Sequence, residues 1–230
     1  MNTSDFKLKQ SVLPKELSFL LFVLAVVFIL WPAKVDAATF NVVAGSSQVN
    51  SDSICQLEEA IGNINDGART YTDCVETGSY GTNDIINLPA GTITGDGSGI
   101  TINESVKIVG LGRGSSVLSN KNLYLYGGSS LTSDFTLQDF KMTNGQGIDT
   151  QEVEHLTIRG LELESSDDYW SGIELLDSGE ANILDSYIHG HLNMSGSGLT
   201  EGILVRMLNR DSSEINIERT TIDQVTHGIT

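Results

Sequence analysis

The C-terminal half of the chain repeats a short pattern that strongly limits the folds open to it. Four segments each carry two apolar residues separated by one other residue, and a third apolar residue follows five positions after the second. They are residues 135–142, 156–163, 181–188 and 215–222. A second marker, the dipeptide Gly-Ile, keeps step with them and begins at residues 147, 172, 202 and 228. Short strands at this period, with no helical pattern between them, predict an all-β parallel solenoid in which each repeat forms one rung.

The pattern of short predicted strands begins earlier in the chain. β-prone segments at 84–88, 100–102, 106–109 and 122–126 are bounded by turn-forming residues. At roughly 25 residues per rung, residues 85–230 hold about six rungs. Leucine-rich repeats have a similar period, but their leucines at fixed offsets are absent here. An antiparallel sandwich or propeller built from hairpins remains the alternative architecture.

Residues 1–37 have the three-part pattern of a secretory signal peptide. Lys7, Lys9 and Lys15 precede an apolar run at 17–31, which is shorter than the roughly 20 residues of a membrane span. Val35 and Ala37 then supply small residues at the expected cleavage site. We therefore expect export, a mature chain without a membrane span, and an extracellular or cell-surface location. A retained N-terminal anchor is the alternative.

The charge balance excludes one class of partner. The chain has 13 Lys and Arg against 30 Asp and Glu, a formal net charge of −17. Loss of residues 1–37 removes four basic and three acidic residues, which leaves a net charge of −18. Such a surface repels a phosphate backbone, so we expect no nucleic-acid partner.

The two cysteines, Cys55 and Cys74, are 19 positions apart. In an oxidising compartment we expect them to form a disulfide, worth about 3 kcal/mol for a loop of this length. Two separately buried thiols are the alternative. A metal site is less well supported, because all four histidines lie at or beyond residue 155.

One short helix is expected next to Cys55. Ser53 and Gln56 fit a capping box, apolar residues recur at helical spacing through 57–64, and Gly67 is a suitable stop. Residues 39–44 read as a strand before it. Residues 38–84 are therefore expected to precede the rungs as a separate segment, and the family resemblance described next implies that this segment is an N-terminal cap.

A family resemblance rests on four pieces in this region. Residues 55–61 (CQLEEAI) resemble the C-S-L-R-E-A-I signature of CSLREA-type secreted bacterial proteins, with Gln56 and Glu58 departing from it. Residues 63–67 (NINDG), 73–74 (DC) and 84–93 (DIINLPAGTI) follow in that family's order. The resemblance covers about residues 40–118. It implies a right-handed parallel β-helix of the pectin-lyase-like type whose first rung is capped by the N-terminal segment, and it is not tied to one reaction.

One column of the repeat is a candidate catalytic site. Two positions past the second apolar residue, successive repeats carry Asp139, Gly160, Asp185 and Arg219. Two carboxylates and a guanidinium on one outward turn would suit Ca²⁺-assisted proton abstraction from a polysaccharide. The alternative is a turn column, where Asp and Gly are expected for backbone reasons.

A loop between rungs is the candidate ligand-binding site. Asp167, Asp168, Tyr169 and Trp170 combine two acids with two aromatic rings, which suits a sugar ring and its hydroxyls. An ordinary loop whose Trp packs on the solenoid is the alternative. His189 and His191 share one side of a strand, and we interpret them as surface residues.

These observations favour a structural, adhesive or carbohydrate-binding module at the cell surface. The alternative is a polysaccharide lyase or glycoside hydrolase that uses Asp139, Asp185 and Arg219. We expect carbohydrate or the cell envelope as partner and no cofactor other than Ca²⁺. Because residues 228–230 repeat the opening of a rung, further domains of a longer chain are also expected.

Overall fold

The structure is a computed structural model of the chain, and it describes residues 37–81, 83–128, 133–145, 147–164, 171–190, 201–207, 213–225 and 227–230. The expected signal peptide therefore lies outside the described residues, apart from Ala37. The one described helix is too short to span a membrane.

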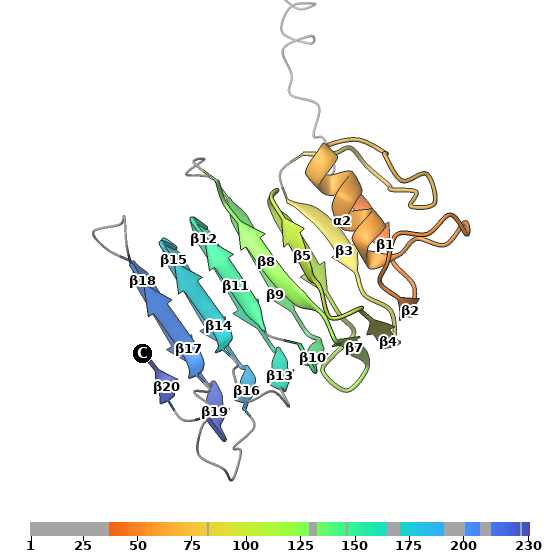
Figure 1. Cartoon of the computed structure of the whole chain (residues 1–230). Coiled ribbons are helices and arrows are strands. Elements are labelled where there is room, and N and C mark those ends of the chain that lie inside the picture. The colour runs from red at the N-terminus through yellow and green to blue at the C-terminus, as the bar shows by residue number, and fades with distance from the viewer. Residues whose placement is uncertain are drawn as a thin grey trace, which may run out of the picture. The chain divides into compact units, whose positions relative to one another are not determined.

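The described strands form three parallel sheets, which confirms the β-helix and excludes a fold built from hairpins (Figure 1). Sheet 1 contains β1 (Thr39–Asn41), β3 (Asp84–Asn87), β6 (Val106–Val109), β9 (Asp134–Gln138), β12 (His155–Arg159), β15 (Glu180–Leu184) and β18 (Glu214–Glu218). Sheet 2 contains β2 (Gly45–Ser46), β4 (Gly91–Thr94), β7 (Ser116–Ser119), β10 (Lys141–Thr143), β13 (Glu162–Glu164), β16 (Tyr187–His189) and β19 (Thr221–Asp223). Sheet 3 contains β5 (Gly99–Ile102), β8 (Asn122–Tyr126), β11 (Ile148–Gln151), β14 (Ser171–Leu176), β17 (Glu201–Arg206) and β20 (His227–Ile229). From β3 to β20, each successive group of three strands makes one rung.

The repeat markers stack directly on one another. In sheet 1, Leu137 pairs with Ile158, which pairs with Ile183. The isoleucines of the Gly-Ile dipeptides form an equivalent row in sheet 3. These residues are buried through most of the coil, because alternate residues of a strand point to opposite faces and one face lines the interior. The interior is therefore a set of apolar rows, one for each inward position of the rung.

The corners of the coil are made by residues with a left-handed backbone. Between sheets 1 and 2 these are Asp139, Gly160, Asp185 and Arg219, with φ values from 50° to 62°. Asn120 and Asn144 turn the chain at the end of sheet 2, with φ of 56° and 57°. Short polar residues and Gly tolerate this conformation best, which explains why the repeat places Asn, Asp and Gly between its strands.

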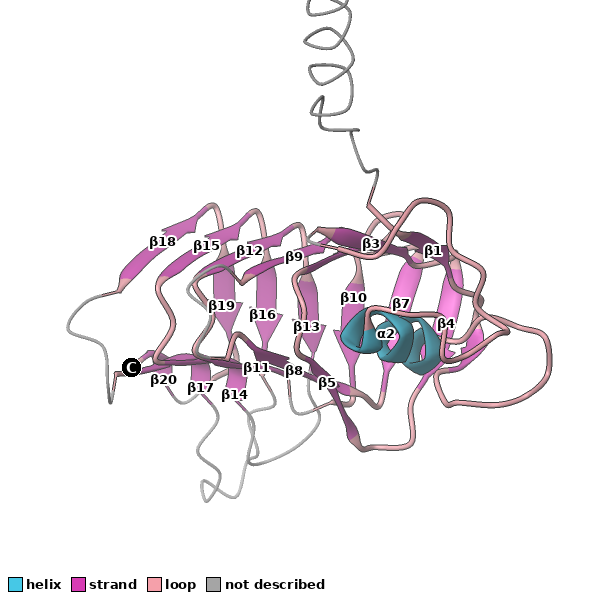
Figure 2. Ribbon diagram, turned by 90° about the horizontal axis from the view of Figure 1, so that it is seen from above, coloured by secondary structure: helices cyan, strands magenta, loops and turns pink. Residues whose placement is uncertain are grey.

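Helix α2 (Leu57–Asp66) completes the first rung in place of a third strand. Its Asn65 side chain donates to the Thr101 carbonyl and accepts from the Asn103 N–H, both at 2.9 Å. These are backbone groups along β5, the edge strand of sheet 3, so the helix covers that edge (Figure 2). The helix ends at Gly67, which has φ of 59°, as expected.

The start of the helix differs from the expected one. Gln56 is the N-cap, and its N–H donates to the Glu59 carboxylate at 3.0 Å. Ser53 lies outside the helix with φ of 65°. The capping box is therefore shifted by three residues, because Glu59 can reach back to the helix start only from the third helical position.

A disulfide links two parts of the cap, and ion pairs of Lys121 link the cap to the coil. Cys55 and Cys74 form the expected disulfide. The Lys121 ammonium, whose side chain is 1% exposed, lies 2.6 Å from the Glu58 carboxylate of α2 and 2.8 Å from the Asp96 carboxylate. Burial acts to lower the pKa of Lys121, but the hydrogen bonds that its ammonium donates to Asp96 and Glu58 outweigh this effect and raise the pKa. Lys121 therefore stays charged and connects the cap to the third-sheet side of the coil.

Replacing Lys121 with Ala is expected to lower the free energy of unfolding by about 2 kcal/mol, because it removes a buried stem and leaves two carboxylates without their cation. Urea denaturation of the purified chain measures this. Lys107→Ala on the outer face of sheet 1 is the matched control, with an expected change within about 0.5 kcal/mol. Equal losses in both variants would contradict the assigned role of Lys121.

Candidate functional site

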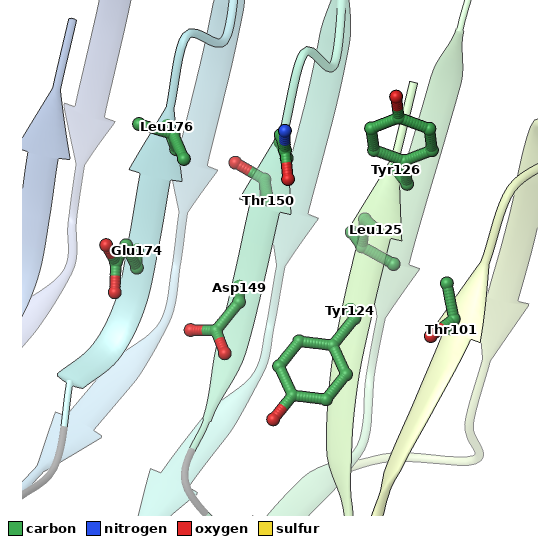
Figure 3. A pocket seen from close by; sticks show the side chains of 9 residues that line it. Thr101, Tyr124, Leu125, Tyr126, Asp149, Thr150, Glu174 and Leu176 are labelled. Carbon is green, nitrogen blue, oxygen red and sulfur yellow. The ribbon is translucent and has the colours of Figure 1, made fainter. Parts of the chain in front are cut away.

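A groove of about 380 Å³ lies on sheet 3 (Figure 3). Its walls come from four adjacent strands, β5, β8, β11 and β14. The lining residues are Thr101, Tyr124, Leu125, Tyr126, Asp149, Thr150, Gln151, Glu174 and Leu176. The groove therefore crosses successive rungs and follows the coil.

Strand register determines which side chains meet in the groove. Thr101 pairs with Tyr124, Tyr124 with Asp149, and Asp149 with Glu174. Neighbouring strands are about 4.8 Å apart, so these four residues form a row with one side chain per rung. The next outward position adds a second row, in which Tyr126 pairs with Gln151 and Gln151 with Leu176.

The tyrosines give the groove an aromatic wall. A side chain at Gly99 would overlap the Tyr124 ring, so the absence of a Cβ allows the ring to lie across the neighbouring rung. Tyr126 is 39% exposed and stands at the other outward position of the same strand. Exposed aromatic faces of this kind bind apolar surfaces and cations.

Asp149 has the most perturbed acidity in the groove. Partial burial, with the neighbouring Glu174 carboxylate as the second cause, raises the pKa of Asp149 to about 6. No other side chain among the described residues forms a hydrogen bond or ion pair with its carboxylate. Glu174 differs in this respect, because Arg206 Nη1 lies 3.4 Å from its Oε1. The groove thus holds two neighbouring carboxylates in different environments.

The candidate catalytic column lies at the corner between sheets 1 and 2, away from the groove. Asp139, Gly160, Asp185 and Arg219 do stack from rung to rung as the repeat predicts: the N–H of Asp139 donates to the Arg159 carbonyl and that of Asp185 to the Glu218 carbonyl, each at 3.0 Å. Asp185 is bound by Arg219, at 2.5 Å from Nε and 3.1 Å from Nη2, while the Asp139 carboxylate accepts from Gln138. The hydrogen bond from Arg219 lowers the pKa of Asp185, opposite to the shift that prepares a carboxylate for proton transfer near neutral pH. The left-handed backbone at all four positions favours the turn interpretation, and their catalytic role stays a prediction.

The other candidates divide between described and undescribed residues. Asp167, Asp168, Tyr169, Trp170 and His191 lie outside the described residues. His189 points outward from sheet 2, where its Nδ1 lies 2.6 Å from Asp223 Oδ1, and Tyr187 donates to Asp223 at 2.8 Å. Within the described ranges, no three Asp, Glu, His or Cys side chains converge as a metal site would require.

Sequence reasoning missed the groove residues, although the repeat marks their position. Asp149 and Glu174 each follow a Gly-Ile dipeptide directly, at the first outward position of a sheet-3 strand. Tyr124 occupies the same place one rung earlier, after Asn122 and Leu123. The Gly-Ile dipeptide was therefore the signal in the sequence that could have located these residues. Only the stacking of the rungs shows that the residues following the dipeptide lie side by side.

Comparison of the chain with protein family models, with characterised proteins and with solved structures finds no match to any of them.

The corner column makes a stability prediction that separates the backbone role from a side-chain role. Gly160→Ala is expected to lower the free energy of unfolding by about 1 kcal/mol, because φ of 62° is strained for a residue with a Cβ and because that Cβ would also displace the Asp139 carboxylate. Asp139→Gly should leave it within about 0.5 kcal/mol. Gly81→Ala, where a Cβ meets no atom within 4 Å, is the control for urea denaturation. A large loss in Asp139→Gly would show that its side chain is needed.

Asp149 makes a pH prediction. Its folded pKa of about 6 lies above the usual 3.8, so the stability it contributes is fully present below pH 3.8 and is lost as the pH rises through 6. Because Asp149 is partly exposed, we expect the free energy of unfolding to fall by about 1 kcal/mol, which is less than the whole pKa shift would give for a fully buried group. Urea denaturation of the wild type and of Asp149→Asn between pH 4 and 7 gives the pH dependence of the free energy of unfolding for each. Burial also raises the pKa of Asp84, but Asp84 is present in both proteins, so its contribution cancels in the comparison. Parallel pH profiles would contradict the prediction.

Proposed function

We propose that this protein is a secreted or cell-surface β-helix module that binds carbohydrate in the sheet-3 groove. The observation that carries the proposal is the row of Tyr124, Asp149 and Glu174 on adjacent rungs. An aromatic face stacks on the apolar face of a sugar ring, and carboxylates accept hydrogen bonds from its hydroxyls.

The shape of the groove supports an extended ligand. Its lining residues come from four successive strands, so a chain of sugars can contact equivalent positions on several rungs. The rung spacing of about 4.8 Å is close to the length of one pyranose unit in an extended chain. An oligosaccharide of repeating sugar units therefore matches the repeating positions of the groove.

The family proposal rests on the cap. The CSLREA-like residues 55–61 enclose the start of α2, Cys74 is bonded to Cys55, and residues 84–93 form β3 and β4. The segments that carry the resemblance thus lie together at the N-terminal end of the described coil. Together with the signal-like residues 1–37 and the disulfide, they support an exported protein of the CSLREA type.

A second candidate function is glycoside hydrolysis. A carboxyl group with a pKa of about 6 next to a second carboxyl group is the arrangement that supplies a general acid and its partner. Asp149 would protonate the leaving oxygen, and Glu174 would act on the sugar or on a water molecule.

A panel of neutral, amino and uronic-acid oligosaccharides tests both candidates, with calorimetry for binding and reducing-end assays for turnover. Tyr124→Leu is expected to weaken binding about tenfold by removing the stacked ring, while Asp134→Asn on sheet 1 should bind as wild type does. Binding without turnover supports the surface module.

Three results would change the assignment. Turnover lost in Asp149→Asn would favour the hydrolase. Turnover lost in Asp185→Ala would place the catalytic site at the corner column instead of the groove. Full affinity in both Tyr124→Leu and Tyr126→Ala would remove the groove as the binding site.

A further inference from the structure

We propose that the groove selects a sugar chain carrying free ammonium groups, an oligomer of amino sugars, over neutral and uronic-acid chains. The inference rests on the proposed carbohydrate binding and names its ligand class. The charge of the groove, the aromatic wall and the Asp149 carboxylate, for which the described ranges hold no cation, each contribute to this choice.

The charges that face Asp149 are unbalanced. β14 contributes the Glu174 carboxylate, β17 contributes Arg206, and β8 contributes the uncharged rings of Tyr124 and Tyr126. Arg206 is already engaged with Glu174 at 3.4 Å. One carboxylate of the row is therefore left without a cation among the described residues, in a site that partly excludes water.

An ammonium group corrects this imbalance. It can donate to Asp149 and at the same time lie against the Tyr124 ring of the adjacent strand, so that a charge-assisted hydrogen bond and a cation–π contact act on one group. A neutral sugar supplies only weaker hydroxyl donors. A uronate brings a third negative charge to a row that already repels it, on a chain whose net charge is −17.

The geometry favours a sugar over a basic peptide. Tyr124 presents a flat ring held across Gly99. The two rows that cross β8 and β11 place polar groups side by side at the spacing of successive rungs. A sugar ring supplies the flat apolar face that such a wall stacks against, and its amino group is rigidly attached to that ring. A lysine ammonium sits on a flexible stem, which loses more conformational freedom when it is bound.

Proton linkage provides a readout specific to Asp149. The carboxyl has a pKa of about 6, and a cation bound beside it favours the ionised form. Binding an amino sugar at pH 6 should therefore release about half a proton from this group. Neutral sugars should release none.

The experiment titrates the wild-type protein with a glucosamine tetramer, an N-acetylglucosamine tetramer, a galacturonate tetramer and tetralysine. Calorimetry at pH 6 in two buffers of different ionisation enthalpy gives both the affinity and the proton count. We expect the glucosamine tetramer to bind about tenfold more tightly than its acetylated form, with proton release, and the galacturonate tetramer to bind most weakly. Asp149→Asn should lose this tenfold preference and the proton release, because the glucosamine tetramer loses more affinity than the acetylated tetramer does, and Asp134→Asn should keep the preference, the proton release and both affinities.

Several results would overturn the inference. Equal affinity for the two glucosamine tetramers, with no effect of Asp149→Asn, would leave carbohydrate binding in place and remove the ammonium selectivity. Tighter binding of the galacturonate tetramer, or equal binding of tetralysine through Asp149, would assign the groove to another ligand class. If no oligosaccharide binds, the proposed function fails together with the inference.

Discussion

The in-register stacking of parallel rungs is the constraint on which the rest of this structure depends. Each inward position of one rung lies on the equivalent position of the next, so apolar side chains form continuous rows inside the coil. Shifting any strand by one residue would turn its apolar side chains outward. The left-handed corner residues preserve that register, because they turn the chain at the same position in successive rungs.

A coil of this kind has an edge at its first rung, and the cap covers it. Strands β1 and β2 pair with β3 and β4, while Asn65 of α2 occupies the hydrogen-bonding groups beside β5. The disulfide closes the cap on itself, and the buried Lys121 holds the helix against the coil through Glu58. The apolar face of α2 then extends the interior rows, with Leu57, Ile61 and Ile64 buried.

Packing constrains the inward positions but leaves the outward ones free to differ between sheets. Sheet 2 presents paired charges, such as Lys141 with Glu162 and Glu164. Sheet 1 presents polar ladders, in which Asn87 bonds to Asn41 across neighbouring strands. Sheet 3 instead combines tyrosines with the Asp149 carboxylate, which no side chain in the described part of the chain pairs with, and this difference makes it the candidate binding face.

The amino-acid sequence by itself determined the parallel coil, its rung length, the short helix and the cysteine pair, because apolar periodicity and turn residues act locally along the chain. It also located the corner column Asp139, Gly160, Asp185 and Arg219, whose members do stack. Only the tertiary structure decided what these positions do. It gave the column a left-handed backbone and an ion pair, moved the helix cap from Ser53 to Gln56, and brought Tyr124, Asp149 and Glu174 into one groove. Residues that are each about 25 positions apart become neighbours only when rungs stack, and the raised pKa of Asp149 arises from the burial and the neighbouring charge which that stacking creates.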